Sequence, residues 1–287
     1  MNFIEIIKPQ KGATVALDSD AVADYFDNYI PEYGLKYFGK GENLPMKSVK
    51  LEWLTKNGEN YEIYVADNPQ FSDVEKYMAG SAASLELKNL IPGKHYFWKV
   101  KVLDGCGNGN FSEVYDFKTK GHVRALAIDG VSNARDLGGA VTKDGKRLKY
   151  GMIFRSANGD SITDCGKAAV KKLGVKTDLD LRGAGVEKSP FGDDVKLIII
   201  NGAYYFGNDT GIQGNEEYRN AFRDELKACA NPDNYPMLFH CAIGRDRTGT
   251  LSFILQALCG VEKDDLIREY ELSYLAVGGA ADKNMGM

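Results

Sequence analysis

The chain has 287 residues, of which 44% are hydrophobic and 26% charged, and its formal net charge is −4. This length allows one or two domains with sizeable cores, and the composition is that of an ordinary globular protein. Because acidic and basic residues are interspersed, the charge balance argues against nucleic-acid binding as the main task. Any anion-binding site must therefore be local.

The N-terminus and the cysteines bear on the compartment. The chain does not begin with a basic segment and a long apolar stretch, and no apolar run is long enough to span a bilayer. The 5 cysteines lack CxxC spacing, so they fit neither a disulfide framework nor a zinc motif, and only 3 histidines are present. We therefore expect reduced thiols, no metal or other cofactor, and a cytoplasmic protein. An extracytoplasmic location is the alternative if a signal peptide has been removed.

Residues 1–120 are expected to form an all-β sandwich domain. Apolar and polar residues alternate over 49–53, 61–65 and 96–102, and clusters of Gly, Asn and Asp separate these runs. The segment 18–46 is rich in tyrosine and phenylalanine, which is unusual for a solvated linker. We expect it to pack on the sandwich or on the neighbouring domain, with substrate binding as the alternative.

Residues 90–100 read Leu-Ile-Pro-Gly-Lys-His-Tyr-Phe-Trp-Lys-Val and resemble the E–F corner and F strand of a fibronectin type III domain. The resemblance implies that Tyr96 is the corner tyrosine, whose hydroxyl bonds to nearby backbone. Any other small β-sandwich is the alternative. Residues 119–122 are the expected linker to the rest of the chain.

Residues 121–287 alternate between strands and helices, which predicts an α/β domain with a central, mostly parallel sheet flanked by helices. The β-branched run 195–200 is typical of a buried central strand. The first helix would be capped by Asp160 or Ser161 and ended by Gly174. Strands are expected at 151–155, 175–181, 195–200 and 237–240, and helices at 161–173, 216–230 and 247–259.

Residues 240–249 read His-Cys-Ala-Ile-Gly-Arg-Asp-Arg-Thr-Gly and lie between a short apolar strand and a helix. Backbone N–H groups and the positive end of the helix would then surround one point, which favours anion binding. The same dipoles and Arg247 would stabilise a thiolate on Cys241, making it a nucleophile at neutral pH. The expected phosphate-binding residues are Ala242, Ile243, Gly244, Arg245, Asp246 and Arg247.

Other features of this loop fit phosphate chemistry. The planar fork of Arg247, six positions after Cys241, can hold two phosphate oxygens. Gly244 would let the backbone approach those oxygens closely, and Thr248 can donate its hydroxyl to the cysteine sulfur when a phosphoenzyme breaks down. The alternative is a buried cysteine at a helix start beside surface arginines.

The loop is similar to the signature of the protein tyrosine phosphatase superfamily, and further motifs resemble its bacterial tyrosine/serine phosphatase branch. These are residues 130–139 (Gly-Val-Ser-Asn-Ala-Arg-Asp-Leu-Gly-Gly), 154–156 (Phe-Arg-Ser), 180–182 (Asp-Leu-Arg) with Glu187, and 270–273 (Tyr-Glu-Leu-Ser). The resemblance covers about residues 123–275. It implies a hydrolase of phosphate monoesters that forms a phosphocysteine intermediate, acts mainly on phosphotyrosine, and extends to dual specificity or phosphoinositides.

The resemblance also implies roles for single residues. Cys241 would be the nucleophile and Arg247 the phosphate clamp. Thr248 would assist the second step, and His240 would tune the cysteine. Arg245 stands where the branch usually has Lys, and it either reaches a second phosphate or is a surface charge.

A general acid must protonate the leaving oxygen, and no Trp-Pro-Asp sequence is present to supply it. Three aspartates compete, namely Asp209, Asp180 and Asp246. We favour Asp209, which lies about where the acid loop of the family falls, with Asp180 next. In the alternative, Asp180 and Arg182 form a structural pair.

Several alternatives stay open. Arg135 and Arg155 either add positive potential near the site or form structural ion pairs. The rival functions are an inositol-polyphosphate phosphatase, a phosphate-binding pseudophosphatase or adaptor, and an arsenate-reducing enzyme with Cys229 or Cys259 as the resolving thiol.

The expected partner is a phosphorylated protein or a phosphoinositide, with no nucleic acid and no transmembrane segment; nothing indicates the oligomeric state. The branch normally continues with more helices after residue 275, so we also expect that the catalytic domain is C-terminally truncated or completed differently.

Overall fold

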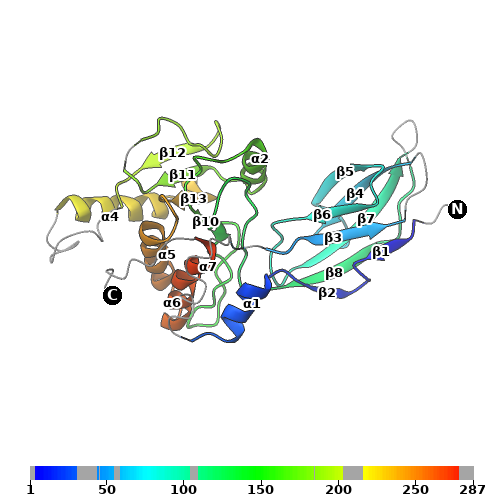
Figure 1. The fold of residues 1–287 in the computed structure, drawn as a ribbon, viewed down its shortest axis with the longest axis horizontal. Helices are drawn as coiled ribbons and strands as arrows, with labels where there is room; N and C mark the ends of the chain where they lie inside the picture. The colour runs from blue at the N-terminus through cyan, green and yellow to red at the C-terminus, as the bar shows by residue number, and fades with distance from the viewer. Residues whose placement is uncertain are drawn as a thin grey trace. The chain divides into compact units, whose positions relative to one another are not determined.

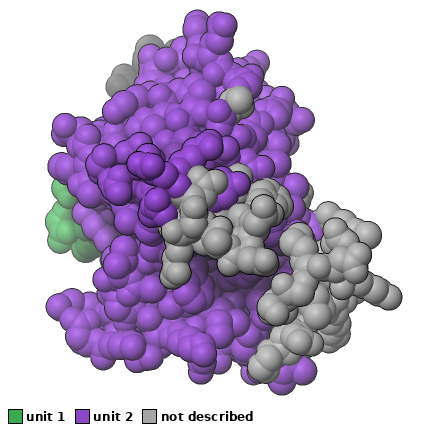
Figure 2. All heavy atoms as spheres, turned by 90° about the vertical axis from the view of Figure 1, so that its left-hand side faces the viewer, with its two compact units in different colours: residues 1–19, 46–122 green, residues 20–45, 123–287 purple. Residues whose placement is uncertain are grey.

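The computed structural model describes residues 4–30, 44, 46–54, 59–103, 109–183, 185–202 and 216–277. The chain divides into two compact units, residues 1–19 with 46–122 and residues 20–45 with 123–287 (Figure 2). The sequence-based boundaries placed residues 20–45 in the first domain, whereas here they belong to the second unit. None of the helices in the described part of the chain is long and apolar enough to cross a membrane.

The first unit is built from two β-sheets, which confirms the predicted all-β region. One sheet has the strand order β1-β3-β6 and the other the order β2-β8-β7-β4-β5 (Figure 1). Neighbouring strands are antiparallel except for β2 and β8, which run parallel. The strands are β1 (Ile6–Lys8), β2 (Ala13–Ala16), β3 (Val49–Trp53), β4 (Asn60–Ala66), β5 (Val74–Gly80), β6 (Ser84–Leu87), β7 (His95–Leu103) and β8 (Tyr115–Lys120).

The alternation of side chains along the strands builds the core between these two sheets. In β7, Tyr96 and Trp98 are buried, whereas Phe97 between them is partly exposed. Trp98 packs in one cluster with Leu51 and Trp53 of β3. The hydroxyl oxygen of Tyr96 accepts a hydrogen bond of 2.9 Å from the backbone N–H of Ile91, so Tyr96 makes the backbone bond expected of a corner tyrosine.

The second unit contains a five-stranded sheet with the order β12-β11-β13-β10-β9, of which Figure 1 labels the first four strands. Only β9 is antiparallel to its neighbour, which confirms the predicted mostly parallel sheet. Its strands are β9 (Arg135–Asp136), β10 (Ile153–Ser156), β11 (Thr177–Asp180), β12 (Lys196–Ile199) and β13 (Met237–His240). Its helices are α1 (Asp20–Asp27), α2 (Asp164–Lys172), α4 (Glu216–Ala230), the 3₁₀ helix η3 (Pro232–Asn234), α5 (Asp246–Leu258), α6 (Lys263–Glu271) and α7 (Ser273–Ala276).

The central strand β13 contributes side chains to the cores on both faces of this sheet. Leu238 packs in one cluster with Val170 of α2. Phe239 packs in another with Cys229 of α4 and Leu251 of α5. Helices therefore cover both faces, and the loop after β13 lies at the carboxyl end of the middle strand, where α/β folds place their ligands.

Two described aromatic residues of the segment 18–46, Tyr25 and Tyr29, pack within the second unit. Tyr25 of α1 is fully buried, and its hydroxyl donates to the backbone oxygen of Arg268 in α6 at 2.8 Å. The hydroxyl of Tyr29 donates to Oε2 of Glu271 at 3.1 Å, and the guanidinium carbon of Arg268 lies 4.9 Å from the Tyr29 ring centroid. For these residues the packing interpretation is supported.

Two predictions about local structure in the α/β unit were wrong. The run 195–200 forms the edge strand β12 with partly exposed residues, not a buried central strand, because a β-branched run fits either position. Helix α2 begins at Asp164 rather than at residue 161. Its cap is Thr163, whose Oγ1 accepts a hydrogen bond from the N–H of Gly166 at 3.1 Å.

The expected linker is also shorter than predicted. Thr119 belongs to β8 and is buried, and its hydroxyl donates to the backbone oxygen of Ile91 at 2.6 Å. Residues 119–120 are therefore part of the β-sheet.

Candidate active site

The loop of residues 241–245 joins the central strand β13 to helix α5. The N-terminus of α5 directly follows the loop at Asp246, so its unpaired N–H groups and positive dipole end adjoin it. Cys241, the first residue of the loop, is only 3% exposed. The structure thus provides the strand, loop and helix arrangement that the sequence predicted.

Two asparagines hold the outer side of the loop. Nδ2 of Asn158 donates to the backbone oxygen of Ala242 at 2.8 Å. Nδ2 of Asn133 donates to the backbone oxygens of Ile243 at 3.1 Å and Gly244 at 2.9 Å. Because the N–H of a trans peptide points away from its carbonyl, the N–H groups that follow these carbonyls turn toward the inner side of the loop. Such a row of N–H groups is a concave site for an anion.

Two fully buried arginines support the loop from β9 and β10. Arg155 donates to the backbone oxygen of Gly244 at 2.5 Å and to Glu269 at 2.7 Å, while Arg135 donates to Glu269 at 2.7 Å. Both arginines also donate to the hydroxyl of Ser273. Burial, together with the neighbouring Arg135, lowers the pKa of Arg155 to about 10. The arginines form ion pairs, and because they share one carboxylate they also leave positive charge beside the loop.

Gly244 is required by the backbone of the loop. Its φ is +69°, and a Cβ at this position would lie 2.4 Å from the backbone oxygen of Ser156. Any side chain would therefore strain the backbone and push the loop away from β10. This reason differs from the close approach to phosphate that the sequence suggested.

Arg247 and Thr248 lie in the first turn of α5. Nη1 of Arg247 donates to the backbone oxygen of Leu181 at 3.1 Å, which anchors one edge of the guanidinium. Nε of Arg247 and Oγ1 of Thr248 are buried and have no hydrogen-bond partner among the residues that the structure describes. Buried polar groups are normally paired, so these two donors can serve a phosphate oxygen or a sulfur atom.

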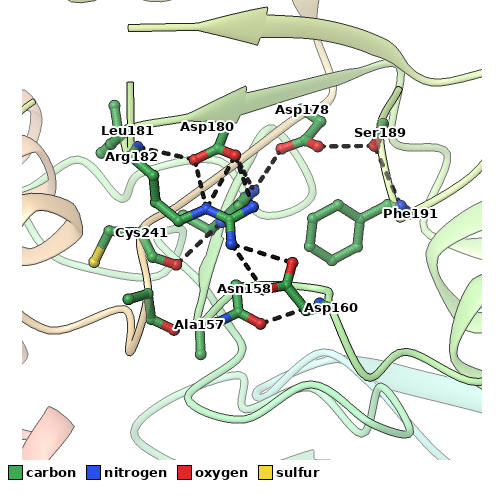
Figure 3. Close-up of polar contacts among 12 residues, drawn as sticks. Ala157, Asn158, Asp160, Asp178, Asp180, Leu181, Arg182, Ser189, Phe191 and Cys241 are labelled. Carbon is green, nitrogen blue, oxygen red and sulfur yellow. Dashed lines mark hydrogen bonds and ion pairs between the residues drawn. The ribbon is translucent and has the colours of Figure 1, made fainter. Parts of the chain in front are cut away.

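The aspartates predicted as general acids have different surroundings. Asp209 lies outside the described residues. Asp180 is fully buried, and Nε and Nη2 of Arg182 donate to its carboxylate at 2.8–3.1 Å (Figure 3). Arg182 also reaches Asp160 at 2.8 Å, and its hydrogen bonds to Asp180 raise its pKa above the ordinary value. These contacts support the alternative interpretation, in which Asp180 and Arg182 form a structural ion pair.

Arg245 is a paired charge. Its Nε lies 3.1 Å from Oδ1 of Asp246, and its guanidinium carbon lies 5.9 Å from the ring centroid of Tyr274. The side chain of Arg245 is only 16% exposed. Ile243, by contrast, is 40% exposed and gives the loop an apolar surface.

His240 lies at the end of β13 and is fully buried. Its Nδ1 is 3.1 Å from the backbone oxygen of Cys241. Its Nε2 is 3.1 Å from Oδ1 of Asp178 and 4.0 Å from Oδ2 of Asp180. Burial opposes the charged ring, but the two carboxylates outweigh it and raise the pKa of His240 above 6.5. In the described part of the chain, no group of three or more His, Cys, Asp or Glu side chains could hold a metal ion.

The structure adds residues that sequence reasoning missed. Asp178 and Asp180 alternate with leucines in Thr-Asp-Leu-Asp-Leu, so the sequence already indicated two acidic side chains on one face of a strand. Asn133 and Ser273 lay within the quoted motifs without an assigned role. Asn158 and Glu269 had no signal in the sequence. The added residues are Asn133, Asn158, Asp178, Glu269 and Ser273.

Comparison with known proteins places this site in a family. Residues 126–285 match the model of the tyrosine phosphatase family. A Cupriavidus necator protein named "putative tyrosine-protein phosphatase" is 30% identical over 170 residues, which cover 50% of this chain and 61% of that protein. A tyrosine-protein phosphatase of Nostoc commune is 30% identical over 140 residues, which cover 42% of this chain and 48% of that protein. The chain thus spans about half to three fifths of the length of these relatives.

Two solved structures each match part of the chain. The match with the core catalytic domain of the PP-IP phosphatase SIW14 from S. cerevisiae covers 48% of this chain and 75% of that chain, with 20% identity and a TM-score of 0.34. The match with the fn3 domain of human contactin 1 covers 28% of this chain and 72% of that chain, with 22% identity and a TM-score of 0.24. The match of the family model spans more than half of the chain, and it includes the whole Cys241 loop. The chain therefore belongs to the tyrosine phosphatase family.

Proposed function

We propose that this chain hydrolyses phosphate monoesters through a cysteinyl-phosphate intermediate on Cys241. In the first step the thiolate sulfur bonds to phosphorus, the bond from phosphorus to the leaving oxygen breaks, and that oxygen takes a proton from a general acid. In the second step the conjugate base of that acid takes a proton from water as the water oxygen attacks phosphorus. The sulfur–phosphorus bond breaks, which returns the thiolate of Cys241, and inorganic phosphate leaves. The observation that carries this proposal is the loop whose carbonyls are bonded outward, since its N–H groups then converge on the inner side.

Arg247 and Thr248 would serve the two steps in different ways. Arg247 is anchored at one edge by Leu181, and its other donors would bind the equatorial phosphate oxygens, whose charge is greatest in the transition state. The buried hydroxyl of Thr248 would donate to the sulfur of Cys241 when the thiolate leaves. His240, Gly244 and the residues around them would hold the loop in place.

Asp209 is the general acid in this proposal, with Asp180 as the second candidate. The fully buried carboxylate of Asp180 is already bound by Arg182, which disfavours proton donation from it. Asp246 is paired with Arg245 in the same way. We therefore expect Asp209→Asn to lower kcat more for poor leaving groups than for good ones, because only poor leaving groups need the proton.

Phosphotyrosine is the proposed substrate class. The pairing of Arg245 with Asp246 favours an ester with one phosphate over a polyphosphate, which would need an uncommitted second cation. The exposed side chain of Ile243 offers an apolar contact for a phenyl ring. The names of the two bacterial relatives agree with this choice.

Hydrolysis of a substrate panel tests the proposal. The panel contains a phosphotyrosine peptide, a phosphoserine peptide, phosphoinositides and inositol hexakisphosphate, all with EDTA present. We expect the phosphotyrosine peptide to be preferred and Cys241→Ser to lower kcat by about 10⁴-fold or more, the scale seen when a nucleophile is removed. Cys259→Ser is the matched control, because Cys259 is an exposed thiol outside the site.

Each other outcome points to a different function. A preference for inositol hexakisphosphate would move the substrate to the inositol-polyphosphate class while keeping the mechanism. Folded, reduced protein without activity on any member would favour the phosphate-binding pseudophosphatase. Equal activity of the Cys241→Ser variant and the wild type would exclude the cysteine mechanism.

A further inference from the structure

One face of strand β11 carries two buried carboxylates next to the Cys241 loop. Asp178 and Asp180 alternate with leucines, are each fully buried, and lie on a strand that pairs in parallel with β13. In this register Asp180 lies opposite His240. Strands inside a parallel sheet are normally apolar on both faces, and a buried carboxylate needs a counter-charge.

The two carboxylates have different partners. Asp180 is bound by Arg182, which balances its charge. Oδ2 of Asp178 accepts a hydrogen bond of 2.8 Å from the hydroxyl of Ser189, which is neutral (Figure 3). Oδ1 of Asp178 and Nε2 of His240 are both buried without a hydrogen-bond partner among the described residues, and they lie 3.1 Å apart, within ion-pair distance. In this part of the chain His240 is the group that can balance Asp178.

The partners of His240 define its charge. Nδ1 faces the backbone oxygen of Cys241, which can only accept a hydrogen bond. Nε2 faces the carboxylate of Asp178, which also accepts. A neutral imidazole has one N–H, so it can serve only one of these acceptors, whereas an imidazolium serves both.

We propose that Asp178 is a positioning residue that keeps His240 as an imidazolium and so fixes a positive charge one residue before Cys241. The inference deepens the proposed function and rests on it, since the charge would stabilise the thiolate and the bound phosphate dianion. Nδ1–H of the same ring holds the carbonyl of Cys241 outward, as the two asparagines hold those of the next three residues.

The surroundings of His240 agree with this assignment. The charged groups that act on it are Asp178 and Asp180 of β11, and both favour the charged ring against the effect of burial. The ring of Phe191 packs edge-on at a centroid distance of 5.4 Å, and the N–H of Phe191 donates to the Ser189 hydroxyl that orients Asp178.

NMR titration of the histidine rings tests the charge directly. The chain has only 3 histidines, so the His240→Asn variant assigns the His240 signals, and the other two serve as internal references. In Asp178→Asn, which keeps the shape and removes the charge, we expect the titration midpoint of His240 to fall by about one pH unit or more. Asp160→Asn is the matched control, because Asp160 binds Arg182 at the exposed end of the same network without contacting His240.

Kinetics tests whether the charge matters for the reaction. We expect kcat/KM of Asp178→Asn to fall by about tenfold at pH 7.5, where its His240 would be neutral, and to recover most of that loss near pH 5.5, where the ring is protonated again. A merely structural role would lower kcat/KM by the same factor at every pH. In a His240→Asn background the Asp178→Asn change should have no further pH-dependent effect.

The two readouts separate this inference from the proposed function. A folded Asp178→Asn protein with an unchanged His240 midpoint, or with an equal loss of activity at all pH values, would overturn the inference. If that variant does not fold, ring ¹⁵N shifts of the wild type at pH 7 decide, because a neutral His240 overturns it and a doubly protonated ring supports it. Failure of the proposed function alone would appear as a charged His240 in a protein that hydrolyses no member of the panel.

Discussion

At the scale of single residues, the effect of Gly244 on the loop geometry can be tested separately from the backbone strain that any side chain at a positive φ would cause. Its φ is +69° and its missing side chain faces the backbone of Ser156, whereas Gly145 has a φ of +78° and no atom within 4 Å of a Cβ position. We expect Gly244→Ala to displace the loop and lower kcat/KM by about 100-fold, because misplacement of reacting groups by about 1 Å has that effect.

Gly145→Ala is the matched control for this prediction. It introduces the same left-handed strain without the clash, so it should lower the free energy of unfolding by about 1 kcal/mol and leave kcat/KM unchanged. Thermal unfolding and steady-state kinetics on both variants measure the two effects. Equal kinetics for the two variants would show that the contact with Ser156 does not set the loop geometry.

At the scale of elements, local sequence patterns predicted helices and strands better than they predicted which strands lie next to one another. The range 216–230 was predicted as a helix and forms α4, and the strand, loop and helix around Cys241 follow from an apolar run, a glycine and a helix start. The edge position of β12 could not be predicted, because strand order depends on contacts between distant segments.

The supporting residues of the site depend on the same distant contacts. Asn158 and Glu269 reach the loop and its arginines only after β10 and α6 come together, so the sequence near Cys241 contains no trace of them. Asp178 is different, because its alternation with Asp180 was visible. The proposed nucleophile and phosphate clamp were therefore both suggested by one motif, whereas most of the residues that hold the loop were not.

Glu269 of helix α6 supplies the carboxylate that pairs with both Arg135 of β9 and Arg155 of β10. Glu269 lies between the fully buried Arg135 and Arg155, so Glu269→Gln would leave two like charges buried without compensation. We expect the free energy of unfolding to fall by about 3–5 kcal/mol, the loss typical of a broken buried ion pair. Chemical denaturation measures it.

Glu271→Gln on the same helix is the control for that prediction. Glu271 accepts a hydrogen bond from Tyr29 and is not paired with the two arginines, so its replacement should cost about 1 kcal/mol. A loss for Glu269→Gln no larger than that of Glu271→Gln would mean that the arginines are stable without their shared carboxylate.

At the scale of the whole molecule, the two units have separate hydrophobic cores and separate natural probes. Both tryptophans of the chain, Trp53 and Trp98, are buried in the core of the first unit. The Cys241 loop belongs to the second unit. Tryptophan fluorescence therefore reports the unfolding of the first unit, and the proposed phosphatase activity would report that of the second.

A matched pair of core substitutions tests whether the units unfold independently. Leu51 and Met237 are each fully buried, one in each core, and replacing either by Ala should destabilise its own unit by about 2–5 kcal/mol. We expect Leu51→Ala to lower the midpoint of the fluorescence transition by roughly 10 °C or more and to leave the temperature of inactivation unchanged. Met237→Ala should do the reverse, since it lies at the far end of β13 from the loop. If either substitution lowers both midpoints, the two units unfold as one cooperative structure. A substitution in one of two independent cores would destabilise only its own unit.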